Sequence, residues 1–208
     1  ELDALADVIV RQTNDLRRIV DEFSKFARMP EPDRRETDLT ALVKAAVMLQ
    51  ENGQPTVKFR REVPDNPVIM ELDATMIGQA LTNLIKNAGE AIETLQEKGA
   101  PAGHVPEIRV TMQADATEAV IRIMDNGTGL PPDRARLFEP YVTTREKGTG
   151  LGLPIVKKII EEHGGTLTLE DAPVFEGGTQ TGAMAVIHLP RSLRKRSGRN
   201  LAAKAQGG

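Results

Sequence analysis

Apolar residues recur at heptad spacing over the first part of the chain. Leu2, Ile9, Leu16 and Phe23 occupy one heptad position, and Leu5, Ile19 and Phe26 follow three residues after it. This pattern predicts one long amphipathic helix, which ends before Pro30 and Pro32 because proline lacks an amide donor and restricts the residue before it. Such a one-sided stripe needs a second helix, most economically in a bundle with a second copy of the chain; the alternative is packing on its own globular domain.

Helices and strands of mixed type are predicted after residues 30–37, which are expected to form a linker. The expected helices are 40–51 (capped by Asp38 or Thr40), 73–98 and 153–163, and the expected strands are 56–63, 67–70, 107–113, 118–124, 166–170 and 183–189. Residues 125–152 are rich in glycine and proline and show almost no periodicity. Strands interleaved with helices, with few strict βαβ units, predict an α+β sandwich in which one helical layer covers a mixed sheet.

Composition narrows the class of protein without naming a partner. The 208 residues, 39% of them hydrophobic, suffice for one or two folded domains, and the net charge of −3 does not indicate a nucleic-acid partner. The chain has no cysteine, which excludes disulfides and thiolate metal sites. Residues 191–208 carry six positive and no negative charges, and we expect a disordered terminus there rather than a nucleic-acid or membrane contact.

Targeting and membrane segments are not evident. No apolar run has the length of a membrane span, and the first residues lack the basic start and apolar centre of a signal peptide. The chain begins without Met and already inside the heptad pattern, so we expect it to be a fragment of a longer protein.

Three clusters of residues could carry chemistry. Asn83 and Asn87 lie four apart in a predicted helix, where asparagine is a poor helix former, and could jointly meet a ligand or a cation, or simply face solvent. Asp125-Asn-Gly-Thr-Gly-Leu130 follows an apolar strand and could bind an amine through Asp125, or form an ordinary turn.

The third cluster, Lys147-Gly-Thr-Gly-Leu-Gly-Leu153, leads directly into a predicted helix. Glycines before a helix N-terminus present unhindered N–H groups and a positive dipole end, which suits phosphate. Arg145 and Lys147 add positive charge there. The spacing differs from dinucleotide and P-loop fingerprints, neither of which occurs.

The order of these motifs resembles the ATP-binding (GHKL, Bergerat-fold) domain of sensor histidine kinases. The first cluster resembles the Asn box of that family, and the second and third resemble its two glycine boxes. The Phe box is matched by the segment Leu137-Phe-Glu-Pro-Tyr-Val-Thr-Thr-Arg145. The resemblance covers about residues 36–190, and Phe23-Ser-Lys-Phe-Ala-Arg-Met-Pro resembles the end of the dimerisation helix in nitrogen-regulation kinases of the NtrY type. It implies a Bergerat-type sandwich over residues 38–190, preceded at 1–29 by the second helix of a dimerisation hairpin.

The resemblance also implies roles for individual residues. Asn87 would ligate Mg²⁺ on the ATP phosphates with support from Asn83, and Asp125 would recognise the adenine amino group. Gly127 and Gly129 would let the chain pass the base, and Phe138 would anchor a lid over residues 131–147. The remaining expected nucleotide contacts are Leu130, Arg145, Lys147, Gly148, Thr149, Gly150, Leu151 and Gly152.

The family pattern implies a γ-phosphoryl transfer to a histidine on a dimerisation helix. Residues 1–29 contain no histidine, and His104, His163 and His188 lie elsewhere, so we expect ATP binding without autophosphorylation. The resemblance further implies a homodimer in the parent protein, a response-regulator partner of the NtrX or NtrC type, and a cytoplasmic kinase core attached to the membrane through segments outside these residues.

Two departures and two alternatives stand beside this interpretation. Glu90 and Ala91 occupy positions where many relatives carry a basic residue and a tyrosine, although the nitrogen-regulation subfamily shares the acidic and small pair. A GHKL ATPase would place a Glu general base one turn before the Mg²⁺ asparagine, but Asn83, which stands there, cannot take a proton. A catalytically silent dimeric interaction module is the second alternative.

Overall fold

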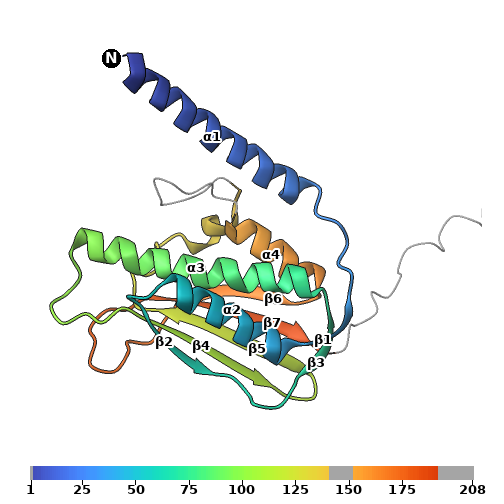
Figure 1. Ribbon diagram of the computed structural model, residues 1–208. Helices are drawn as coiled ribbons and strands as arrows, with labels where there is room; N and C mark the ends of the chain where they lie inside the picture. Colours follow the sequence, from blue (N-terminus) through green and yellow to red (C-terminus); the bar gives the residue numbers. More distant parts are fainter. Residues whose placement is uncertain (1, 141–151, 192–208) are drawn as a thin grey trace, which may run out of the picture.

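The computed structural model describes residues 2–140 and 152–191, and these form a long helix attached to an α+β sandwich (Figure 1). The helices are α1 (Leu2–Ala27), α2 (Leu39–Gly53), α3 (Ala74–Gly99), the short 3₁₀ helix η1 (Arg134–Phe138) and α4 (Gly152–Glu162). The strands are β1 (Arg35–Asp38), β2 (Lys58–Glu62), β3 (Ile69–Leu72), β4 (Glu107–Ala114), β5 (Glu118–Asp125), β6 (Thr166–Asp171) and β7 (Ala183–Pro190). Each expected helix and strand is present.

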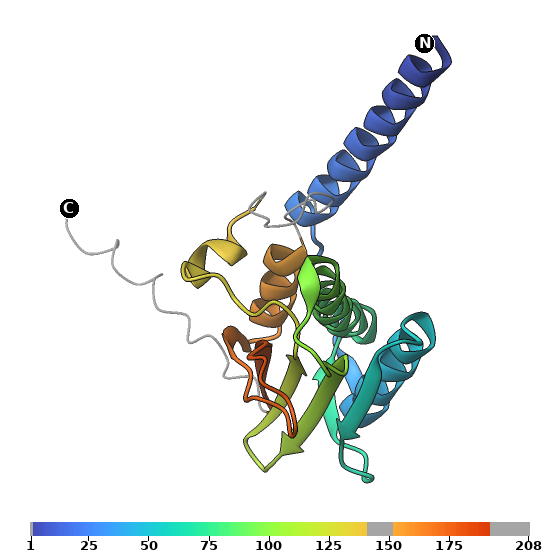
Figure 2. The same ribbon diagram turned by 90° about the vertical axis from the view of Figure 1, so that its left-hand side faces the viewer.

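A five-stranded mixed sheet forms one layer, with strand order β2-β4-β5-β7-β6. β2 runs parallel to β4, and the other pairs are antiparallel. Helices α2, α3 and α4 cover one face of this sheet, as Figures 1 and 2 show. The expected α+β sandwich with one helical layer on a mixed sheet is therefore confirmed.

The core lies between the helical layer and the sheet. Strand β4 alternates buried Ile108, Val110 and Met112, which face the helices, with more exposed polar residues that face away. Helix α3 supplies the longest buried stripe, which consists of Ile77, Ala80, Leu81, Leu84, Ile85, Ala88 and Ile92. This packing fixes the rotation of α3 and so decides which of its side chains point toward a ligand.

Aspartates begin two of the helices. The Asp38 carboxylate accepts a hydrogen bond from the Thr40 N–H at 3.0 Å at the start of α2, so Asp38 rather than Thr40 is the cap. Asp73 caps α3 by accepting from the Met76 N–H at 3.0 Å.

The expected linker of residues 30–37 is shorter in the structure, because Arg35–Asp38 form strand β1. β1 pairs antiparallel with β3, with Arg35 opposite Leu72 and Asp38 opposite Ile69. A pairing partner more than thirty residues away leaves no local pattern in a four-residue polar strand, which is why the sequence did not predict it.

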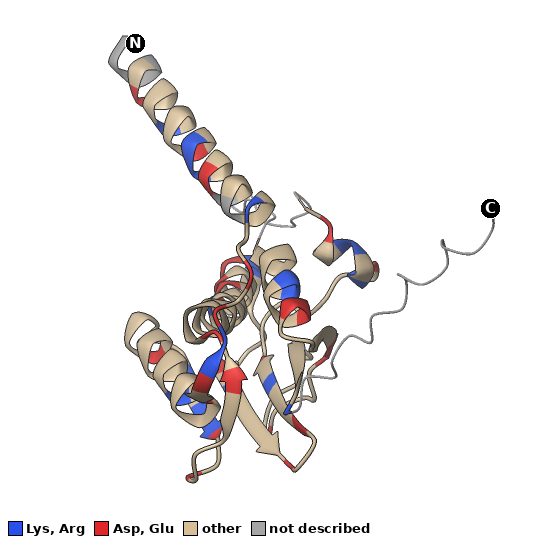
Figure 3. Cartoon of the chain, turned by 90° about the vertical axis from the view of Figure 1, so that its right-hand side faces the viewer, with Lys and Arg blue, Asp and Glu red and all other residues tan. Residues whose placement is uncertain are grey.

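Helix α1 extends away from the sandwich, and its C-terminal end alone meets the helical layer (Figure 2). Phe26 and Met29 pack partly buried against the core, and the Lys158 ammonium donates to the Phe26 carbonyl at 3.2 Å. Charges of both signs follow one another along α1 (Figure 3). Within residues 2–140 and 152–191, no helix combines the length and apolarity needed to cross a bilayer.

Candidate nucleotide-binding site

Helix α3 carries two asparagines at the margin of its buried face. Leu84, Ile85 and Ala88 are buried against the sheet, whereas Asn83 and Asn87 are half-buried. The four-residue spacing places both carboxamides on one side of α3, one turn apart. They therefore share a face beside the core, as the spacing predicted.

Asp125 is the last residue of β5, and backbone amides hold its carboxylate. The residue is only 5% exposed, and Oδ1 accepts hydrogen bonds from the N–H groups of Gly127 at 2.8 Å and Ala183 at 3.3 Å. The bond from Gly127 is that of an Asx turn, so the segment is a turn as well as a candidate site. One donor from the turn and one from the start of β7 fix the orientation of the carboxylate at the end of the sheet.

Gly127 brings this turn against the backbone of α3. A Cβ at Gly127 would lie 2.5 Å from the carbonyl carbon of Ala91 and 2.6 Å from the amide nitrogen of Ile92, so no larger residue fits. The next residue, Thr128, donates its N–H to the Ala91 carbonyl at 3.3 Å. Ala91 lies four residues beyond Asn87, about 6 Å along the helix axis. The Asp125 turn therefore docks one helical turn from the asparagine face.

The segment after the turn is anchored at its start. Gly129 has a φ of +75°, which favours glycine, and Leu130 after it is half-buried. Phe138 in η1 packs against the core, with the Lys157 ammonium 5.0 Å from the centre of its ring. Phe138 is thus held against α4, whereas residues 141–147 of the expected lid lie outside the described residues.

The second glycine box lies mostly outside the described residues. This applies to the expected nucleotide contacts Arg145, Lys147, Gly148, Thr149, Gly150 and Leu151. Gly152 is the first residue of α4, and a Cβ there would meet nothing within 4 Å. Helix α4 lies beside α3 in the helical layer (Figure 1), so the N-terminus of α4 belongs to the layer that carries Asn87.

Three residues that the sequence did not single out support the Asp125 turn. Gln180, in the loop between β6 and β7, donates its side-chain N–H to the Gly127 carbonyl at 2.9 Å. In the same loop, a Cβ at Gly182 would collide with the Asp125 carbonyl oxygen. The third is Asn126, whose side chain is hydrogen-bonded to the backbone of Glu107 and Val105 at the start of β4. A glycine just before the last strand was a usable signal for Gly182, but no local signal marked Gln180.

Both residues that depart from the family pattern make local contacts. Glu90 lies 3.8 Å from Lys86 one turn earlier, in an i, i+4 ion pair on the polar side of α3. Ala91 contributes its backbone, since its carbonyl accepts the bond from Thr128.

The sequence of this chain is similar to those of proteins from one known family. Residues 72–193 match the family described as histidine kinase-, DNA gyrase B- and HSP90-like ATPase. The nitrogen regulation protein NtrY of Azorhizobium caulinodans is 49% identical over 84% of this chain and 22% of its own length. Sensor histidine kinase ZraS of Escherichia coli is 30% identical over 80% of this chain and 34% of its own. The chain thus spans about a fifth to a third of these relatives.

Solved structures agree with the sequence relatives. The mycobacterial sensor histidine kinase MprB has a TM-score of 0.62 at 27% identity, covering 76% of this chain and 97% of its own. The catalytic domain of histidine kinase ThkA gives 0.62 at 28% identity, with 76% and 96% covered. The chain belongs to the histidine kinase-, gyrase B- and HSP90-like ATPase family. Within that family it carries the ATP-binding catalytic domain of an NtrY-like sensor histidine kinase, and the ATPase alternative is not favoured.

Proposed function

We propose that residues 38–190 bind ATP together with Mg²⁺ in the site formed by α3, the Asp125 turn and the start of α4. The observation that carries this proposal is the docking of the turn on Ala91, one helical turn from Asn87. This docking places a carboxylate that can accept from an amine and an amide oxygen that can meet a cation at neighbouring positions of one site. Gly127, Gly129 and Leu130 would line the base end of this site.

The Asn87 side chain suits Mg²⁺ that is already held by phosphates. The half-buried carboxamide offers a neutral oxygen at the edge of the core, and Mg²⁺ prefers a few hard protein oxygens besides phosphate and water. When bound, the ion would neutralise charge developing on the transferred phosphoryl group. Asn83 would keep the Asn87 amide oriented from one turn earlier.

The phosphate end would be completed by the second glycine box. We propose that Gly148, Gly150 and Gly152 present their N–H groups to the phosphates, and that Arg145 and Lys147 add positive charge. Thr149 and Leu151 would contact the nucleotide beside them.

The chemistry we propose is phosphoryl transfer to a histidine outside this chain, followed by relay to an aspartate of a response regulator. Such transfer depends mainly on alignment and charge neutralisation, which the site can supply without a protein base at Asn83. NtrY is the name of the relative at 49% identity, so a regulator of the NtrX or NtrC type is the proposed partner.

Helix α1 would pair with a second copy in the parent protein. Ile9, Leu16 and Phe23 lie on one heptad stripe and are exposed in the structure. In this division residues 1–29 are half of a dimerisation hairpin, and 30–37 connect it to the catalytic domain, with strand β1 beginning at Arg35 near the end of that connection. Residues 191–208 form a basic tail whose residues beyond 191 lie outside the described part.

Calorimetric titration of ATP, with and without Mg²⁺, tests the nucleotide site. We expect Asn87→Ala to remove the Mg²⁺-dependent gain in affinity and Asp125→Ala to weaken ATP binding in both conditions. Asn52→Ala, an exposed asparagine on α2, is the matched control and should titrate like the parent. Failure of the parent to bind ATP would contradict the proposal and favour a silent interaction module.

Supplying the acceptor separately tests the reaction. We expect no acid-labile phosphohistidine when the chain alone is incubated with γ-labelled ATP, and labelling of an added NtrY-type hairpin that carries its histidine. Asn87→Ala should abolish that labelling. Stable label on the chain alone would overturn the view that its own histidines are not acceptors.

A further inference from the structure

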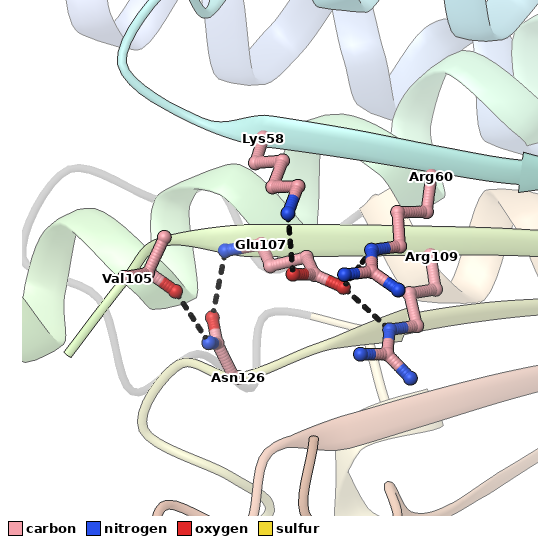
Figure 4. Close-up of polar contacts among 6 residues, drawn as sticks. All are labelled: Lys58, Arg60, Val105, Glu107, Arg109 and Asn126. Carbon is pink, nitrogen blue, oxygen red and sulfur yellow. Dashed lines mark hydrogen bonds and ion pairs between the residues drawn. The ribbon is translucent and has the colours of Figure 1, made fainter. Parts of the chain in front are cut away.

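Asn126, directly after Asp125, uses its side chain to extend the β4–β5 ladder. In the antiparallel register Asp125 lies opposite Ile108, so the next pair would join residue 126 to Glu107. The Asn126 side chain makes these bonds instead: Oδ1 accepts from the Glu107 N–H at 3.0 Å, and Nδ2 donates to the Val105 carbonyl at 2.8 Å (Figure 4). A side-chain amide presents an N–H donor and a carbonyl acceptor as a peptide group does, with one further N–H on its nitrogen, so it can close the ladder in the backbone's place.

Because the Asn126 side chain takes the place of the backbone in the ladder, the main chain is free to leave the sheet here. With its side chain bonded to β4, the backbone at Asn126 can turn toward α3, where Gly127 and Thr128 meet Ala91. The Asn126 carbonyl is held as well, because His104 Nε2 lies 2.9 Å from it and must be the donor, a carbonyl being able only to accept.

Asn126 is buried beside a cluster of ion pairs. The residue is 8% exposed. Next to it, the buried Glu107 carboxylate is paired with Arg109 at 2.5 Å, Arg60 at 3.2 Å and Lys58 at 4.0 Å (Figure 4). The Arg109 guanidinium also lies 3.9 Å over the ring of Phe175, which belongs to the same loop as Gln180. The turn is therefore clamped from β4 by Asn126 and from the β6–β7 loop by Gln180.

We propose that Asn126 is a positioning residue for purine recognition: its side chain sets the place of the Asp125 carboxylate and so determines the preference for a 6-amino purine. The proposal rests on the nucleotide site proposed above. A carboxylate accepts a hydrogen bond from a 6-amino group but faces a 6-oxo group with oxygen against oxygen, so a fixed Asp125 separates ATP from ITP. Loss of the clamp would let the carboxylate shift, and the preference would fall.

The test measures the affinities of ATP and ITP for the same protein samples. We expect Asn126→Ala to reduce the ratio of ATP affinity to ITP affinity by about tenfold, which corresponds to about 1.4 kcal/mol. The affinity for ITP itself should change less than the affinity for ATP. Asn126→Asp keeps the shape and the acceptor but loses the donor to Val105, and it should reduce the ratio too. His104→Ala removes only the bond to the Asn126 carbonyl from a loop, so it should fold and reduce the ratio by about two- to threefold.

Controls separate positioning from stability and from the nucleotide site itself. Val110→Ala, in the core of the same strand, should lower the unfolding temperature and leave the ratio unchanged. A parent without ATP preference, or Asp125→Ala with the parent's ratio, would remove the proposed function. A normal parent and a sensitive Asp125→Ala, combined with an unchanged ratio in the Asn126 and His104 variants, would overturn only the role of Asn126.

Discussion

Helices α1 and α3 have the same length and similar apolar stripes, but only one of them is buried. Each contains 26 residues. Leu81 in α3 is 1% exposed, whereas Leu16 in α1 is 61% exposed. An amphipathic pattern therefore states that a helix needs a partner, and the rest of the chain decides whether the partner is present.

The difference lies in what surrounds each helix. α3 has the sheet beneath it and α4 at its side, and its N-cap Asp73 is hydrogen-bonded to the N–H of Asp33 and to the side chain of His163. α1 contacts the sandwich at its C-terminal end, beside an open pocket of about 410 Å³ lined by Met29, Met76, Ile155 and neighbouring residues. Incomplete packing at this joint fits a helix whose principal partner lies elsewhere, as the proposed dimer requires.

The largest expected effect separates the two stripes directly. Leu81→Ala opens a cavity in the core and should lower the free energy of unfolding by about 2–5 kcal/mol. The matched change Leu16→Ala removes the same atoms from an exposed site and should change it by less than about 0.5 kcal/mol. Urea unfolding followed by circular dichroism measures both. Equal losses would mean that α1 is buried in solution by a contact the isolated chain already makes.

The next effect concerns the fixed start of α3. Desolvation by burial acts to raise the pKa of Asp73, but hydrogen bonds from the N–H groups of Met76, Asp33 and Thr75 outweigh it and lower the pKa overall. Asp73→Ala removes the cap and the tether to residue 33, and it should cost about 1–2 kcal/mol of unfolding free energy. Asp33→Ala, which keeps the Asp33 backbone donor, is the control for the tether. An unchanged unfolding midpoint in Asp73→Ala would show that the core alone fixes the start of α3.

The elements of the sandwich could be predicted from the sequence because their signals are local. Long alternating or helical periods and the aspartates before two helices specify each element by residues close in sequence. Strand β1 and helix η1 escaped prediction because their signals are not local: β1 is four polar residues stabilised by pairing with β3, and η1 is a single short turn held by Phe138.

The candidate site divides in the same way. Asn83, Asn87 and the glycines stand out by type and spacing, so the sequence could nominate them. What it could not provide is the support beneath them, since Asn126 extends a ladder whose register is visible only in the folded sheet. Gln180 reaches Gly127 across more than fifty residues, a contact that no local pattern encodes.

The stability of the sandwich at the start of α3 should be sensitive to acid, because His163 lies there. Desolvation by burial lowers the pKa of His163, whose Nδ1 donates to the Ile159 carbonyl at 2.7 Å and whose Nε2 accepts from the Asp73 N–H at 3.0 Å. Both ring nitrogens are therefore matched to the neutral form. The unfolded chain binds a proton at this histidine at higher pH than the folded chain does. The contribution of His163 to stability is therefore constant above the unfolded pKa of about 6.5 and falls as pH drops below it.

The corresponding experiment compares the parent with His163→Gln between pH 7.5 and 5. As pH falls, the free energy of unfolding of the parent should drop more steeply than that of the variant. The two slopes should differ by at most about 1.4 kcal/mol per pH unit, because a single proton is involved. His104 and His188 are present in both proteins and cancel in the comparison. Identical slopes would show that protonated His163 is tolerated at the junction of α4 and α3.

The smallest expected effect is at the joint between α1 and the sandwich. The Lys158 ammonium donates to the Phe26 carbonyl at 3.2 Å and lies 5.4 Å from the centre of the Phe26 ring. Lys158→Ala should leave the unfolding of the sandwich unchanged but weaken this attachment by about 0.5–1 kcal/mol, the value of an exposed cation–π contact. Amide hydrogen exchange of residues 24–29 should then rise by about two- to fivefold. Lys157→Ala, at the preceding position, removes a contact to Phe138 instead and should not change the exchange of residues 24–29. A rise in both variants would locate the effect in α4 itself, and a rise in neither would mean that Phe26 and Met29 hold the end of α1 by apolar packing alone.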